Sequence, residues 1–199
     1  MNASPHGTAD KPTRQEQSST QATGCSAYSL WFLWLLASML GMGLGWALGW
    51  RLSFALPGFL ATWAIGILAG GFLGASQALV LRPLVGSSSL WILANLFGWP
   101  TGFFLGAQLA SIWGFTDFAF GAVIGAIVGL VLGLAQWLVL RAKLARTAWW
   151  MPVSVIAWTL SLAVYLPGLS AMGFLYGAIS GSITGLLLLG LRFGIFQHT

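Results

Sequence analysis

Charged residues are scarce in this 199-residue chain, which contains eight basic residues and three acidic ones. They make up 6% of the sequence, whereas soluble domains typically carry about 25% charged residues. After residue 28 the charges are limited to a few positions: Arg51, Arg82, Asp117, Arg141, Lys143, Arg146 and Arg192. So few charges cannot cover a surface that faces water, which excludes a soluble enzyme.

Cysteine and histidine are nearly missing as well, and with them the usual intramembrane chemistry. The single cysteine, Cys25, excludes a disulfide scaffold, and the two histidines, His6 and His198, lie near the chain ends. Intramembrane proteases and metalloenzymes need a general base or metal ligands inside the membrane, and ion-coupled transporters normally retain ionisable groups there. The apolar segments have no such residues away from their ends, so we expect no catalytic residue, no metal site and no cofactor.

The net charge of +5 does not indicate nucleic-acid binding. Such binding needs lysine and arginine clustered on a solvated face, whereas the basic residues here stand singly at the ends of apolar segments. The expected partner is the lipid bilayer, together with a larger membrane complex or further copies of the same chain.

Hydrophobic residues, at 58%, and glycine, at 27 residues, are abundant instead. A bilayer core about 30 Å thick requires about 20 apolar helical residues. Helix-breaking and polar residues divide the chain into expected spans at 29–50, 58–81, 90–112, 118–140, 149–166 and 170–191. We therefore predict an all-α integral membrane protein with six transmembrane helices.

Both termini are expected on one side of the membrane. Residues 1–28 are rich in Ser, Thr, Gln and Ala and are predicted to be a disordered tail, and residues 193–199 form a short C-terminus. With six spans, nearly all basic residues fall on the side of the termini: Lys11, Arg14, Arg82, Arg141, Lys143, Arg146 and Arg192. The positive-inside rule places that side in the cytoplasm.

The sequence contains an internal repeat. Residues 70–82 read GGFLGASQALVLR and residues 129–141 read GLVLGLAQWLVLR, and an offset of 59 superimposes them. The same offset superimposes tryptophans of the following helix, Trp91 on Trp150 and Trp99 on Trp158.

A third copy is aligned at an offset of 110, which matches Pro57-Gly58 with Pro167-Gly168 and Leu81-Arg82 with Leu191-Arg192. In this alignment Leu187 stands in place of the repeated glutamine. The repeating unit is a helical hairpin in one orientation, and parallel repeats are related by an axis along the membrane normal. We therefore predict three hairpins around a pseudo-threefold axis, with the second, fourth and sixth helices inside.

The string G-x3-G-x2-Q-x-L-V-L-R, followed by a helix with a Gly-Trp pair, resembles a group of uncharacterised bacterial multi-pass membrane proteins that is frequent in cyanobacteria. The resemblance covers residues 57–192 and is closest at 70–82 and 129–141. It implies a multi-pass fold in the bacterial inner (plasma) membrane, or in the thylakoid membrane if the source is cyanobacterial. It implies no activity.

Glycines spaced four residues apart recur along nearly every expected span. Small residues at this spacing let helix backbones approach closely in lipid, where apolar side chains gain nothing by leaving the hydrocarbon. The alternative is a glycine-lined pore or a groove that holds a flat pigment. We predict helix packing through Gly-xxx-Gly faces, at Gly70, Gly74, Gly129, Gly133, Gly181 and Gly185.

Gln77 and Gln136 are the polar residues that stand out within the spans. Each follows a packing glycine, Gly70 or Gly129, by seven residues, which is almost two helical turns. The amide therefore shares the glycine face and points into the bundle. We interpret the pair as interhelical hydrogen-bonding residues; the alternative is a ligand or ion site near the cytoplasmic side. Further possible members of a polar cluster are Asn95, Gln108 and Thr184.

Tryptophan is also frequent, at twelve residues. Six of them stand near span ends, as an aromatic belt at the membrane interface requires: Trp31, Trp50, Trp91, Trp137, Trp149 and Trp150. Trp63, Trp99 and Trp158 lie deeper, where a packed core or a lipid-facing position is expected. Stacking on a carotenoid or quinone is the alternative for these three.

Two functions remain consistent with the sequence. The first is a non-enzymatic structural, assembly or accessory-subunit protein. The second is a small-solute binding or transport subunit, similar in size and span number to the substrate-capture subunits of vitamin importers. The first predicts a dry, filled bundle, whereas the second predicts a polar cavity at Gln77 and Gln136.

Overall fold

Helices account for almost all of the residues that the computed structural model describes, which are 14–86, 88–144, 147–164 and 171–192. The α-helices are α1 (Arg14–Ser53), α2 (Gly58–Val85), α3 (Ser89–Ile112), α4 (Asp117–Leu140), α5 (Trp150–Ala163) and α6 (Met172–Arg192), and a 3-10 turn, η1 (Thr147–Trp149), precedes α5. Within these ranges there is no strand. The predicted all-α fold is confirmed.

Five of the helices are long and apolar enough to cross a membrane: the Tyr28–Ser53 part of α1, and α2, α3, α4 and α6. The described part of the predicted fifth span, 149–166, belongs to the apolar segment Thr147–Ala163, and residues 165–166 lie outside the described residues. At about 1.5 Å per α-helical residue and about 2.0 Å per 3-10 residue, this segment is about 27 Å long. Among the described residues, five helices therefore meet the length and apolarity of a membrane span, and the segment before the sixth falls slightly short of the about 30 Å of a bilayer core.

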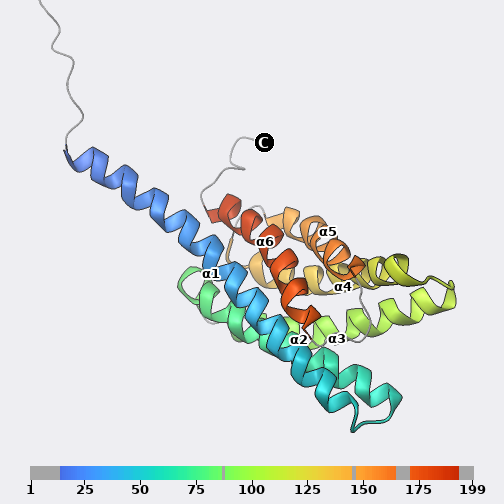
Figure 1. Cartoon of the computed structure of the whole chain (residues 1–199). Coiled ribbons are helices and arrows are strands. Elements are labelled where there is room, and N and C mark those ends of the chain that lie inside the picture. The colour runs from blue at the N-terminus through green and yellow to red at the C-terminus, as the bar shows by residue number, and fades with distance from the viewer. Residues whose placement is uncertain (1–13, 87, 145–146, 165–170, 193–199) are drawn as a thin grey trace, which may run out of the picture.

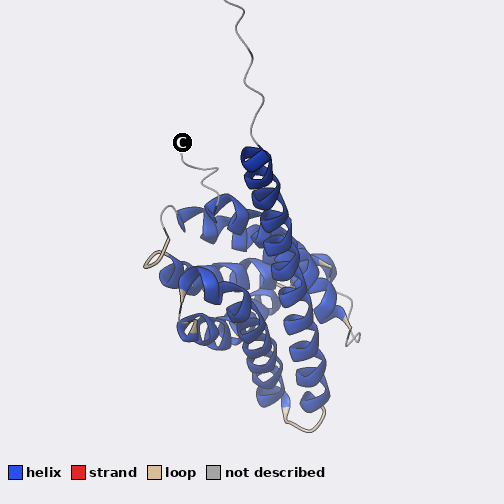
Figure 2. Cartoon of the chain, turned by 90° about the vertical axis from the view of Figure 1, so that its left-hand side faces the viewer, coloured by secondary structure: helices blue, strands red, loops and turns tan. Residues whose placement is uncertain are grey.

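The first helix begins much earlier than expected, at Arg14. The prediction of disorder is wrong for residues 14–28, and residues 1–13 lie outside the described part of the chain. Gln15, Glu16 and Gln17 favour helix, and extending an existing helix costs far less than starting one. Both views show this first part of α1 standing clear of the other helices (Figures 1 and 2).

The second helix ends later than the expected residue 81 and includes Pro83. Gly86 stops the helix instead: its φ is 75°, and its N–H donates a hydrogen bond of 3.0 Å to the carbonyl oxygen of Arg82. Glycine adopts such a positive φ without steric cost. The turn between α2 and α3 therefore starts one helical turn after Arg82.

The six helices form a closed ring. Each helix packs extensively on its neighbours along the chain, and α6 packs on α1. No extensive contact joins α2, α4 and α6 to one another among the described residues, so the predicted inner trio of the second, fourth and sixth helices is wrong. The physical reason is that buried aromatic side chains of α1, α3 and α5 occupy the centre.

Buried side chains form two clusters along the ring. One cluster joins the first membrane turns of the odd-numbered helices to the last turns of the even-numbered ones, including Leu81, Leu140 and Leu188. The other joins the opposite parts of the same helices. Odd and even helices therefore run in opposite directions. We call the end that carries Arg82, Arg141, Lys143 and Arg192 the basic end; Arg146 lies outside the described residues.

Candidate functional site

Three tryptophans meet at the centre of the ring, toward the basic end. Trp34 of α1, Trp91 of α3 and Trp150 of α5 are each at most 1% exposed. Their ring centroids lie 5.9, 6.2 and 5.7 Å apart in the three pairs, all in edge-to-face geometry. This geometry brings the positive edge of one ring to the negative face of another. We call these residues the tryptophan triad.

The expected aromatic belt is therefore wrong for Trp91 and Trp150. Both stand at the start of their helices, but a helix in a ring turns one side of its first turn toward the axis. Position along a span does not fix the direction of a side chain. Trp149, the preceding residue, is 57% exposed, whereas Trp31, Trp50 and Trp137 are half-buried.

Two indoles of the triad donate hydrogen bonds to glutamines. Nε1 of Trp91 lies 3.1 Å from Oε1 of Gln77 on α2, and Nε1 of Trp150 lies 2.9 Å from Oε1 of Gln136 on α4. Both glutamines are buried. The sequence reasoning thus placed the two amides on inward-facing positions, but it did not identify their aromatic partners.

The amide nitrogens of the same glutamines bind the preceding odd-numbered helix. Nε2 of Gln77 donates to Oγ of Ser38 on α1 at 2.9 Å, and Nε2 of Gln136 donates to Oδ1 of Asn95 on α3 at 3.1 Å. Asn95 in turn donates to the carbonyl oxygen of Trp91. Each glutamine therefore bridges three consecutive helices, and both polar atoms of its amide are used within the protein.

Thr184 takes the corresponding place on α6. Nε1 of Trp34 donates to Oγ1 of Thr184 at 3.0 Å, as the other two indoles donate to glutamine. The alignment that puts Leu187 at this position is therefore wrong by three residues, since the spacing from Gln77 to Thr184 is 107 rather than 110. The contacts of the ring set this register, and Arg192 stands three residues beyond position 189, which this register aligns with Arg82.

The third position lacks the bridge that glutamine makes. The hydroxyl of Thr184 donates to the carbonyl oxygen of Ser180 on its own helix. Ser154 on α5 follows Trp150 by four residues, just as Ser38 follows Trp34 and Asn95 follows Trp91. Its buried Oγ has no hydrogen-bond partner among the described residues. Threonine is one of the shorter polar side chains and does not span the gap between α6 and α5.

The same register aligns glycines in the three even-numbered helices. A Cβ added at Gly74, Gly133 or Gly181 would lie 2.6–2.8 Å from a side-chain Cβ of the adjacent odd-numbered helix. These neighbours are Asn95, Ser154 and Ser38 respectively. One turn earlier, Gly70, Gly129 and Gly177 lie against the carbonyl oxygens of the same three residues. Gly185 lies against the rings of Trp31 and Trp34.

A second aromatic layer fills the ring further from the basic end. The ring centroids of Trp46 and Trp99 lie 6.0 Å apart, those of Trp99 and Trp158 lie 6.1 Å apart, and Tyr176 lies 5.4 Å from Trp46. Trp99 and Trp158 are buried, in agreement with a core position, and Trp63 is half-buried. The layer closes the centre of the ring below the triad.

Other polar residues lie away from this network. Gln108 is exposed, so it does not join the glutamines. In the ranges that the structure covers, no group of His, Cys, Asp and Glu residues is placed to hold a metal ion. The site is therefore a set of neutral amides, hydroxyls and indoles.

Sequence reasoning missed Trp34, Ser38 and Ser154. A signal for them is present, because a tryptophan followed four residues later by a small polar residue occurs in α1, α3 and α5 alike. It is hidden by the different spacing between copies, which is 57 from α1 to α3 and 59 from α3 to α5. Comparison with protein-family models, curated protein sequences and solved structures finds no match for this chain.

Proposed function

We propose that this chain is a non-enzymatic membrane protein of structural, assembly or accessory-subunit type. The observation that carries the proposal is the filled centre, where the tryptophan triad is hydrogen-bonded to Gln77, Gln136 and Thr184. A polar group used in this way stabilises one arrangement of helices. A solute path along the axis would have to displace three buried indoles and break their bonds.

The proposed architecture is a threefold repeat of helical hairpins packed through Gly-xxx-Gly faces. Its support is the threefold recurrence of one contact pattern, in which an indole binds a polar side chain and a glycine meets the residue four places after that indole. Close backbone approach at small residues is the main source of helix association in lipid. Such a rigid bundle suits a partner that needs a fixed outer surface.

The alternative function, a small-solute binding subunit, needs free polar atoms in a cavity. Both polar atoms of the Gln77 amide, and both of the Gln136 amide, already have protein partners. A ligand would have to replace bonds of about 0.6 kcal/mol each, the average measured for such contacts in membranes. The paired amides therefore favour the structural function.

Isolation from native membranes tests the two functions against each other. The tagged chain is purified in mild detergent, and mass spectrometry identifies both co-purifying proteins and bound small molecules. We expect a stoichiometric membrane-protein partner that is lost when the outer surface is altered. A stoichiometric vitamin-like solute without any protein partner would overturn the structural proposal.

We further propose that the basic end faces the cytoplasm of a bacterial cell, with both termini on that side. The test uses single-cysteine variants in a Cys25→Ser background. Ala55→Cys lies in the turn between α1 and α2, and Ala142→Cys lies directly after α4; both positions are exposed. A membrane-impermeant maleimide should label Ala55→Cys in intact cells and Ala142→Cys only after permeabilisation. The reverse pattern would overturn the orientation.

A further inference from the structure

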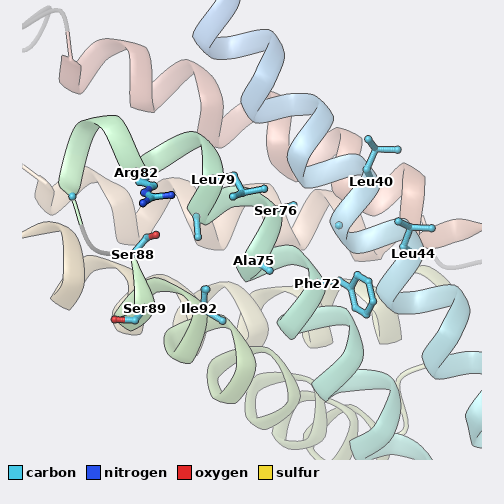
Figure 3. A pocket seen from close by; sticks show the side chains of 13 residues that line it. Leu40, Leu44, Phe72, Ala75, Ser76, Leu79, Arg82, Ser88, Ser89 and Ile92 are labelled. Carbon is cyan, nitrogen blue, oxygen red and sulfur yellow. The ribbon is translucent and has the colours of Figure 1, made fainter.

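An apolar groove runs along the outside of the ring between α1 and α2 and ends at the turn before α3. Its volume is about 840 Å³, and its walls include Leu40, Leu44, Phe72 and Leu79 (Figure 3). These four side chains are 39–74% exposed. On the outside of a transmembrane bundle, such a surface faces the hydrocarbon chains of the lipid.

A positive charge closes one end of this groove. Arg82 lines the groove there, and Figure 3 shows its guanidinium and the Ser88 hydroxyl on the same side of the α2–α3 turn. Of the three acidic residues of the chain, Asp10 and Glu16 precede the apolar part of α1, and Asp117 begins α4 at the opposite end of the bundle. Arg82 therefore carries a charge that matches an anionic group at the membrane surface.

The length of the groove fits one leaflet of a bilayer. From Phe72 to Arg82 is ten residues along α2, which corresponds to about 15 Å. Half of a hydrocarbon core about 30 Å thick is the same length. An acyl chain whose head group sits at Arg82 would therefore reach Phe72 at about the bilayer midplane.

A second apolar depression adjoins the first on the α3 side of α2. Its volume is about 290 Å³, and it shares Phe72 and Ala75 with the main groove while Gly71 and Leu96 line its far part. Two adjoining apolar channels match the two acyl chains of a phospholipid. A single-chain amphiphile would fill the main groove alone.

We propose that this groove binds one phospholipid with an anionic head group, in the leaflet of the basic end. Arg82 and the Ser88 hydroxyl contact the phosphate, and the N-terminus of α3 adds a favourable dipole because Ser88 makes no side-chain cap bond to that helix. The acyl chains lie along Leu79, Ala75 and Phe72. The bound lipid thus covers the outer junction of α1, α2 and α3.

Arg141 supplies a matched control. It occupies the position of Arg82 in the second copy of the repeat, but its guanidinium carbon lies 4.9 Å above the ring centroid of Trp137 on its own helix. A cation over an aromatic face is already stabilised by the ring. Removing this charge changes the net charge by the same amount without touching the groove.

The test is native mass spectrometry of the full chain in mild detergent, titrated with phosphatidylglycerol or with phosphatidylcholine of the same acyl composition. We expect one phosphatidylglycerol to be retained in preference to phosphatidylcholine. Arg82→Gln should weaken that retention about fivefold, the effect of one basic residue near a membrane surface, and Arg141→Gln should leave it unchanged. Ala75→Phe, which fills the exposed groove and keeps the arginine, should lower retention of both lipids.

The proposal is overturned if Arg82→Gln retains phosphatidylglycerol as the parent does, or if Arg141→Gln loses as much. It is also overturned if Ala75→Phe has no effect, or if the parent chain retains no lipid, whether as a monomer or as a dimer. Near-UV circular dichroism of the buried tryptophans shows that each variant is folded. All three substituted residues are exposed, so the bundle should tolerate them.

Discussion

Gln77, Gln136 and Thr184 share one kind of hydrogen bond in the ring and differ in a second. All three accept a hydrogen bond from an indole of the tryptophan triad. Only Gln77 and Gln136 also bind the preceding odd-numbered helix. The glutamine bridge is missing between α5 and α6, where Ser161 instead donates to the carbonyl oxygen of Tyr176, and among the described residues that interface is the least extensive in the ring.

The comparison separates two sources of helix association. Glycine contacts are present on all three even-numbered helices, so close packing does not depend on the polar bridge. The bridge is an addition that reaches across to a third helix. We therefore expect glycine variants to have similar effects in every copy and polar variants to have unequal ones.

The largest expected effect comes from filling a glycine contact. Gly129→Leu and Gly177→Leu both place a side chain against backbone atoms of the adjacent helix, which cannot move without shifting the whole helix. Each should lower the free energy of unfolding by more than an overpacked core typically does, which is about 1–3 kcal/mol. Thermal unfolding in detergent measures the loss, and Gly58→Leu is the control because nothing lies within 4 Å of that position. Parent-like melting of either variant would contradict the role of the glycines.

A smaller loss should follow from removing a polar partner, and here the copies should differ. Gln136→Leu leaves two buried groups without a partner, the Trp150 indole N–H and the Asn95 amide oxygen. Thr184→Val leaves only the indole of Trp34. A buried unsatisfied group costs about 1–3 kcal/mol, so denaturant titration should show the glutamine variant to be the less stable. Equal stabilities would remove the distinction between the copies.

A smaller loss of stability is expected from substituting Ser38 or Ser154, each of which follows a tryptophan of the triad by four residues. Ser38→Ala removes the acceptor of the Gln77 amide and leaves one buried donor without a partner, which should lower the free energy of unfolding by about 1 kcal/mol, the lower end of the range for such a group. Ser154→Ala removes a hydroxyl that has no partner and should leave stability unchanged or slightly raised. The two variants, compared in one unfolding assay, serve as controls for each other.

The smallest effect is a gain. Thr184→Gln gives α6 the side chain that α2 and α4 have, and the new amide should reach Ser154 and add a bond of about 0.6 kcal/mol. The gain should vanish in a Ser154→Ala background, which makes the pair a double-mutant cycle. A gain that persists in that background would come from packing and not from the bridge.

Much of the fold follows from the sequence, for a physical reason. A segment that crosses a lipid bilayer must be long, apolar and nearly uncharged, and these local properties predict the helices. The spacing of Gln77 and Gln136 from the packing glycines predicts that both amides face inward. The burial of Trp91 and Trp150 could not, since it depends on how six helices surround a common axis. A tryptophan at a span end suits an interface and a ring centre equally well.

The register of the third copy failed for a different reason. The offset of 110 rests on Leu191 and Arg192, at the end of α6 beyond the glycines that touch α1, and on Pro167-Gly168, outside the described residues. Glycines that touch a neighbouring backbone tolerate no shift, and Gly173, Gly177 and Gly181 match those of α2 at the spacing of 107. Alignment on packing glycines would have found Thr184, which follows Gly181 by three residues as Gln77 follows Gly74.

The closure of α6 on α1 has a consequence for biosynthesis. Trp34 and Thr184 are 150 residues apart, and ribosomes add about 5–20 residues per second, so the indole is made roughly 8–30 s before its acceptor. During that interval α1 can pack on α2 and, through Trp34, on Trp91 and Trp150, while the side of α1 that later contacts α6 is open to the membrane. The contacts of the first helix of this protein are therefore completed only when the last helix has been made.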